Sequence, residues 1–219
     1  MDVRVSLGAH EAAVLEAHAR RHLRWDPLSV ARVVTTGTAL GVFTSPPLGV
    51  LAFAAVPVQG SVERCDVTVT MSAFADALPL MADGGMDLAT IPEVIVPPAG
   101  APSVHHLPPS EGWHMPIPAV SGDLVPLVTE AIEEFRQRAV SLGDFGRQTL
   151  AEEIWSRPGW AGLPLRMLHA AYRLGFLPDD QSRVSASACG PWRRLQTVRG
   201  QVFGYDRGAS ARLALHVVR

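Results

Sequence analysis

Residues 149–205 read TLAEEIWSRPGWAGLPLRMLHAAYRLGFLPDDQSRVSASACGPWRRLQTVRGQVFGY. The segment Thr149–Ser156 has helical spacing, and Thr149 with Glu152 makes a capping box at its start. Residues 157–162 (RPGWAG) are typical of a turn, and Leu163–Leu177 predicts an amphipathic helix. Four alternating segments then predict an antiparallel meander: Arg183–Ala188, Trp192–Val198, Gln201–Tyr205 and Ala211–Val218.

This order of helix, turn, helix and basic hairpin resembles a winged helix-turn-helix. On a helical wheel Leu165, Leu168 and Ala171 share one face of the last helix, and the basic side chains share the opposite face. A basic helix beside a basic hairpin is what docking into a DNA groove requires. The predicted contact residues for DNA or an acidic protein partner are therefore Arg166, His169, Arg173, Arg193, Arg194 and Arg199.

The alternative for this set is a group of ordinary surface charges, because any amphipathic surface helix exposes Arg and His. The helix also lacks the Asn, Gln, Ser or Thr side chains that help to read bases, which disfavours specific readout. The distribution of charge favours an anionic partner. Residues 1–127 carry 6 Arg against 12 acidic residues (−6), and residues 128–219 carry 13 Arg against 9 (+4).

A second unusual stretch, Val33–Val62, contains no charged residue. Its Gly and Pro residues would break a membrane helix repeatedly, so no membrane span is expected. A hairpin fits better, with Val33–Thr44 paired to Val50–Val58 across Ser45–Gly49, and Asp66–Thr70 adding a strand. Strands without charge need cover on both faces, either within the molecule or in an oligomer. A homodimer through this hairpin is therefore the alternative to a central sheet.

The rest of the chain completes an α+β fold. Amphipathic spacing predicts helices over Gly8–Arg24, over Ser72–Met81 with Ser72 as the N-cap, and from Asp123 onward. The proline-rich stretch Pro92–Pro118 predicts an extended connector. We therefore predict an N-terminal antiparallel sheet with flanking helices (residues 1–91), a connector (92–122) and a C-terminal three-helix and β-meander region with winged-helix character (123–219). A meander that joins the N-terminal sheet in one domain is the alternative.

No catalytic, cofactor or metal motif stands out. His18 and His22 have the i,i+4 spacing of metal ligands, but the neighbouring Arg20 and Arg21 disfavour a cation. His105, His106 and His114 lie in the connector without a Cys or carboxylate at diagnostic spacing. All 19 residues counted as Lys or Arg are Arg, so the chain contains no Lys. The absence of Lys excludes Schiff-base chemistry through Lys and a P-loop with its phosphate-binding Lys. We therefore expect no cofactor and no metal.

The absence of Lys and Asn, whose codons are AT-rich, predicts a GC-rich bacterial genome. The N-terminus lacks the pattern of a secretory signal, so we expect a cytoplasmic location. These observations favour a non-enzymatic binding or regulatory protein that contacts DNA or an acidic protein. The alternatives are an assembly module that dimerises through the uncharged hairpin, and an enzyme with an unmarked pocket.

Overall fold

A computed structural model describes residues 3–97 and 99–206 of the 219-residue chain. The chain forms two compact units, Met1–Leu107 and Pro108–Arg219, and each is described by itself. The division falls inside the proline-rich stretch, and the three-segment division into 1–91, 92–122 and 123–219 stays a prediction. Among the described helices, none combines the length and the apolar character that a membrane crossing requires.

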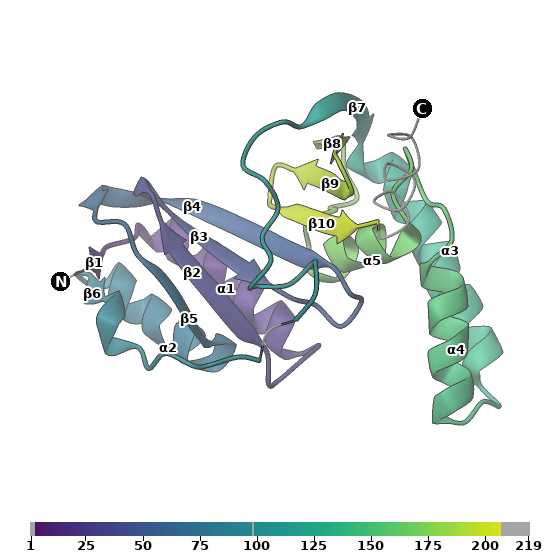
Figure 1. Cartoon of the computed structure of the whole chain (residues 1–219), viewed down its shortest axis with the longest axis horizontal. Helices are drawn as coiled ribbons and strands as arrows, with labels where there is room; N and C mark the ends of the chain where they lie inside the picture. Colours follow the sequence, from purple (N-terminus) through teal and green to yellow (C-terminus); the bar gives the residue numbers. More distant parts are fainter. Residues whose placement is uncertain (1–2, 98, 207–219) are drawn as a thin grey trace, which may run out of the picture. The chain divides into compact units, whose positions relative to one another are not determined.

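The N-terminal unit is an antiparallel sheet with two α-helices. Its elements are β1 (Arg4–Val5), α1 (Ala9–Leu23), β2 (Val30–Thr35), β3 (Gly37–Thr44), β4 (Leu51–Val62), β5 (Asp66–Thr70), α2 (Met71–Ala82), β6 (Met86–Asp87) and the 3-10 helix η1 (Leu88–Thr90). Four strands lie in the order β5-β2-β3-β4, and the short strands β1 and β6 pair separately (Figure 1).

The predicted hairpin is present, but its first strand is two strands. Phe43 lies opposite Phe53 in the β3–β4 ladder, as the turn at Ser45–Gly49 predicts. The expected strand Val33–Thr44 instead breaks at Thr36, where the Thr36 N–H donates to the carbonyl of Ala39. Gly37 has a φ of 75°, a left-handed conformation that glycine adopts without steric cost, so the chain reverses there.

The two helices pack on one face of this sheet. Helix α1 contacts β4, and α2 contacts β2 and β5. The sheet residues Val33 and Val42 are fully buried, as are Leu15 of α1 and Phe74 of α2, so the unit has its own apolar core. Helix α2 begins one residue earlier than predicted because Thr70, rather than Ser72, accepts the capping hydrogen bond, from the Ala73 N–H.

The C-terminal unit also contains a four-stranded antiparallel sheet. Its elements are β7 (His114–Val120), α3 (Ser121–Ala139), α4 (Asp144–Trp155), α5 (Leu165–Arg173), β8 (Arg183–Cys189), β9 (Trp192–Thr197) and β10 (Gln201–Tyr205). These strands lie in the order β10-β9-β8-β7, so the predicted meander is present from β8 to β10. The predicted strand Ala211–Val218 falls outside the described residues.

Three predictions for this unit need correction. Helix α4 begins at Asp144, so Thr149 lies inside the helix, and its hydroxyl donates to the Phe145 carbonyl instead of capping. The stretch expected to be an extended connector contains β7, which pairs with β8 although it includes Pro116 and Pro118. β7 is the last strand in the order of this unit's sheet, where proline is tolerated because one side needs no ladder hydrogen bonds. The winged-helix character is not shown.

Candidate functional site

Helix α5 places two residues of its predicted basic face, Arg166 and His169, against α4. Leu165, Leu168 and Ala171 are buried, as the helical wheel predicted. On the other side the Arg166 guanidinium donates to Glu152 Oε1 of α4 at 2.6 Å, and the ring of His169 lies 4.0 Å from the ring of Trp155, centroid to centroid. Arg166 is therefore neutralised within the unit, and His169 is largely covered by an aromatic ring.

The environment of His169 also removes its charge at neutral pH. Burial, assisted by the positive charge of Arg173, lowers the pKa of His169 from 6.5 to about 4. A neutral imidazole gains no Coulombic attraction from a phosphate. His169 thus acts as a packing residue at neutral pH, although sequence spacing places it among the cations.

Arg193 and Arg194 point to opposite faces of the sheet, because neighbouring residues on a strand alternate. Arg193 donates to the carbonyls of Gly190 and Trp192 at 3.0 and 3.1 Å and lies 3.6 Å from a carboxylate oxygen of Asp206. The two arginines of the predicted basic hairpin therefore do not lie on one face of the sheet.

Arg194 lies among aromatic rings on its side of the sheet. Its guanidinium carbon is 4.3 Å from the centre of the Trp113 ring, and its Nε donates to Ser187 Oγ at 2.9 Å. Trp113 in turn lies 5.8 Å from Phe203. Burial lowers the pKa of Arg194, although an arginine side chain remains charged. The Arg194 guanidinium thus stacks on Trp113 within the unit.

Arg173 and Arg199 are the two exposed members of the predicted set. Arg173 ends α5, and Arg199 lies in the β9–β10 turn, where its Nη1 is 3.5 Å from the carbonyl oxygen of Gly175. Both side chains therefore lie near the C-terminal end of α5. Hydrogen bonds from Ser182 and, to a smaller extent, the charge of Arg199 lower the pKa of Asp180, so a carboxylate shares this end of the unit.

A four-residue ion-pair network takes up further arginines. Arg157 donates to both carboxylate oxygens of Glu134 at 2.6 and 2.9 Å and to Glu153 at 2.8 Å. Arg138 donates to the same two carboxylates. Hydrogen bonds from Arg157, and then from Arg138, lower the pKa of Glu134 to about 2. The network ties α3 to α4 and leaves no net charge among its members.

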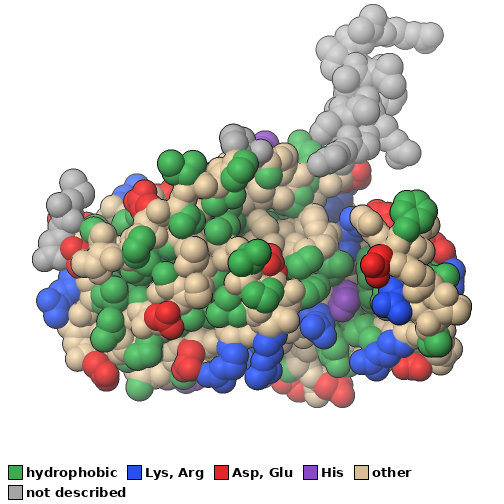
Figure 2. All heavy atoms as spheres, turned by 90° about the horizontal axis from the view of Figure 1, so that it is seen from below, with side chains coloured by type: hydrophobic (Ala, Val, Ile, Leu, Met, Phe, Trp, Pro, Cys, Tyr) green, Lys and Arg blue, Asp and Glu red, His purple; other side chains and the backbone are tan. Residues whose placement is uncertain are grey.

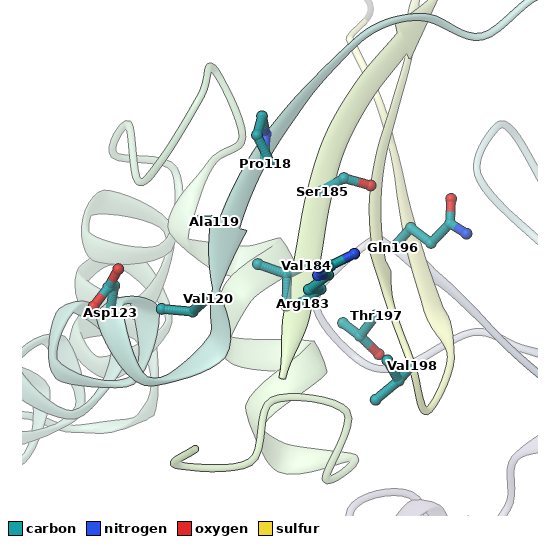
Figure 3. Close-up of a pocket in the computed structure, with 10 residues that line it drawn as sticks. All are labelled: Pro118, Ala119, Val120, Asp123, Arg183, Val184, Ser185, Gln196, Thr197 and Val198. Carbon is teal, nitrogen blue, oxygen red and sulfur yellow. The ribbon is translucent and has the colours of Figure 1, made fainter. Parts of the chain in front are cut away.

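A groove with a volume of about 700 Å³ opens beside β7, β8 and β9 (Figure 3). Its lining combines apolar and polar residues: Pro118, Ala119, Val120, Asp123, Arg183, Val184, Ser185, Gln196, Thr197 and Val198. Arg183 is exposed, and no carboxylate in the described part of the chain forms an ion pair with it. The sequence prediction missed Arg183. Arg183 stands at the start of a predicted strand, and this was the available signal. Only the pairing of β8 with β9 shows that this strand lies beside the basic hairpin.

The histidines form no metal site among residues 3–97 and 99–206, where no three His, Cys, Asp or Glu side chains gather closely enough. His18 and His22 are buried in α1 with ring centroids 6.2 Å apart. Burial, with the charges of His22 and Arg21, lowers the pKa of His18 to about 3. Burial also lowers the pKa of His22. Both are neutral core residues at pH 7.

Acidic and basic side chains lie interspersed on the face of the molecule in Figure 2, and they do not gather into one positive field there. Among the described residues of the C-terminal unit, Arg173, Arg183 and Arg199 are the exposed arginines of α5 and the sheet region, and α3 and α4 carry further exposed arginines at Arg136, Arg138 and Arg147.

Each unit matches the model of a domain family. Residues 4–96 match the domain of unknown function DUF8010, and residues 108–209 match the domain of unknown function DUF8185. No curated protein is similar enough in sequence to count as a match.

Solved structures of bacterial clamp subunits are similar in fold. The DNA polymerase III subunit beta of Pseudomonas aeruginosa matches with 11% identity and a TM-score of 0.53, over 94% of this chain and 64% of that one. The pol III beta of Caulobacter crescentus gives 11% identity and 0.54, over 94% and 65%. The subunit beta of Borrelia burgdorferi gives 9% and 0.51, over 96% and 67%. The chain thus has an α+β, clamp-like fold and spans about two thirds of the length of these proteins.

Proposed function

We propose that this chain is a DNA-associated, clamp-like binding protein. The observation that carries the proposal is the similarity of fold to DNA polymerase III beta subunits over 94% of the chain, which includes both units. Because the identity is 11%, the likeness concerns the fold, and the DNA contact must be argued from the chain's own side chains.

The proposed contact is with phosphates and not with base edges. Of the six residues predicted from the sequence, Arg173 and Arg199 are exposed, and Arg183 joins them as an exposed cation of the same unit. A winged-helix mode of reading bases would need the outer face of α5, which Glu152 and Trp155 of α4 occupy. Guanidinium groups at a surface attract the DNA backbone without selecting a sequence.

The test is the salt dependence of binding to a duplex of arbitrary sequence, measured by fluorescence anisotropy. Each phosphate contact contributes about 0.9 to the slope of log K against log salt, so removal of three contacts reduces the slope by about 3. The triple variant R173Q/R183Q/R199Q is compared with a control that loses the same charge at other exposed positions, R64Q/R136Q/R147Q.

We expect the first variant to bind more weakly and with a flatter salt dependence, and the control to resemble the unmodified chain. Absence of binding to any duplex at low salt refutes the proposal. An equal loss in both variants refutes the assignment of these three arginines, because it indicates a response to net charge alone.

A second candidate function is the binding of an acidic protein segment in the groove beside Arg183. The groove favours it because apolar walls and one exposed cation lie together there. The single variant R183Q distinguishes the two. It removes one of three proposed phosphate contacts from DNA, but it removes the only Arg among the described residues that line the groove.

A further inference from the structure

The face of the N-terminal sheet opposite α1 and α2 carries an apolar patch. Phe43 and Phe53 lie opposite each other in register, with ring centroids 4.4 Å apart, and both remain partly exposed. Glycine at position 41 leaves room for the Phe53 ring, since a Cβ there would lie 2.7 Å from that ring and 3.1 Å from Val34. The Phe53 ring therefore lies across the glycine and close to the sheet.

Small and apolar residues continue the patch along β4. Ala55 and Pro57 follow Phe53 at alternate positions on the same face, and both are exposed. The neighbouring half of this face, over β2 and β5, is different. There Arg32 donates to Asp66 through two nitrogens at 2.7 Å and to the Val104 carbonyl at 2.8 Å. The segment that includes Val104 is thereby tied to β2, whereas Ala55 and Pro57 of the β3–β4 half are exposed.

The patch is free of charge. No Asp, Glu, Lys, Arg or His occurs from Val33 to Val62, and the ion pair of Arg32 and Asp66 neutralises the nearest charges. A polyanion or a basic protein finds no opposite charge on this face. The Arg32–Asp66 pair at its border also makes contact with lipid tails unfavourable.

We propose that this face, defined by Val34, Gly41, Phe43, Phe53, Ala55 and Pro57, binds the same face of a second copy of the chain. A two-fold interface requires a patch that is complementary to itself, and an uncharged patch meets its own copy without repulsion or unpaired charge. The two sheets pack face to face at about 10 Å, as in a β-sandwich. Aromatic rings from both copies meet at the centre, where binding energy concentrates.

This inference does not depend on DNA binding, because the residues belong to the N-terminal unit and the proposed phosphate contacts to the C-terminal unit. The experiment is sedimentation equilibrium of the full chain without DNA, over a range of concentrations. The test variant is Ala55→Arg, which places a charge in the patch. The matched control is Ala13→Arg, which adds the same charge at an exposed position of α1.

We expect a reversible dimer for the unmodified chain and for A13R, and a dissociation constant about tenfold higher or more for A55R. Circular dichroism establishes that each variant is folded, and Pro57→Glu serves as the test variant if A55R does not fold. A strict monomer at all concentrations overturns the proposal. A dimer that is equally stable in A55R or P57E also overturns it, because the contact then lies on another surface.

Discussion

Because the imidazole of His169 is covered, we predict that acid destabilises the C-terminal unit. The perturbation is a shift from pH 7 to pH 5, combined with the substitution His169→Gln. Because burial lowers the pKa of His169 from 6.5 to about 4, the unfolded chain binds this proton more tightly than the folded chain. The contribution of neutral His169 is therefore complete above pH 6.5 and is lost as the pH falls from 6.5 toward 4.

The size of the effect follows from the two pKa values. At pH 5 His169 is almost fully protonated in the unfolded chain and largely neutral in the folded chain. The linkage relation then gives a loss of about 2 kcal/mol between pH 7 and pH 5 from this one side chain. A glutamine side chain cannot take up a proton in this range, so the substitution H169Q should remove this part of the pH dependence.

The assay is urea unfolding followed by tryptophan fluorescence at both pH values. Four of the five tryptophans lie in the C-terminal unit, so the signal reports mainly on that unit. The control is His114→Gln, which makes the same substitution at an exposed histidine of the same unit. If the free energy of unfolding of H169Q falls between pH 7 and pH 5 as steeply as that of the unmodified chain, His169 is not the source of the acid sensitivity.

Two further predictions concern packing and ion pairs in the same unit. Gly200→Ala places a Cβ 2.6 to 2.8 Å from the ring of Phe176, so we expect the free energy of unfolding to fall by about 1–3 kcal/mol. The control Gly143→Ala, where a Cβ would meet no atom within 4 Å, should cost far less. Equal losses of the two variants in urea unfolding would contradict this explanation. Glu134→Gln removes the carboxylate that binds Arg157 through two hydrogen bonds, so the midpoint of thermal unfolding should fall. The difference in midpoint between the variant and the unmodified chain should shrink at high salt, because salt screens ion pairs. A difference in midpoint that is independent of salt would assign the loss to packing.

Much of the fold follows from local patterns in the sequence. The periodicity of apolar residues located α1 and α2 to within a residue or two, and the alternation in DVTVT and QVFGY located β5 and β10. These elements have strong local signals because one face of each is buried against the unit's own core.

One misplaced limit had a local signal, and the other depends on a distant partner. Thr36 lies in an uncharged run that reads as one strand, although Gly37 forms a local turn that pairs Thr35 with Leu40. The β7 strand contains two prolines, and its role depends on the neighbour β8, which follows more than sixty positions later in the chain. Local propensity does not contain this information.

The candidate site shows the same limit more sharply. A helical wheel divides α5 into a core face and an opposite face, but it cannot show that α4 packs on the opposite face with Glu152 and Trp155. In contrast, the separation of Arg193 from Arg194 follows from strand geometry alone. The net charge of the C-terminal half was read correctly, yet its carboxylates are the partners of Arg157 and Arg166, so net charge did not predict surface charge.

The two proposed interactions, DNA binding and dimerisation, should respond to salt in opposite ways, because only the first uses charged side chains. Contacts of Arg173, Arg183 and Arg199 with phosphates release counterions, so DNA binding weakens steeply as salt rises. Contacts between two uncharged sheet faces gain from the removal of apolar surface from water, so dimerisation persists in high salt and strengthens with sulfate. A chain that loses both activities together as sodium chloride rises would contradict the assignment of self-association to the charge-free patch, because only a charged interface behaves in that way.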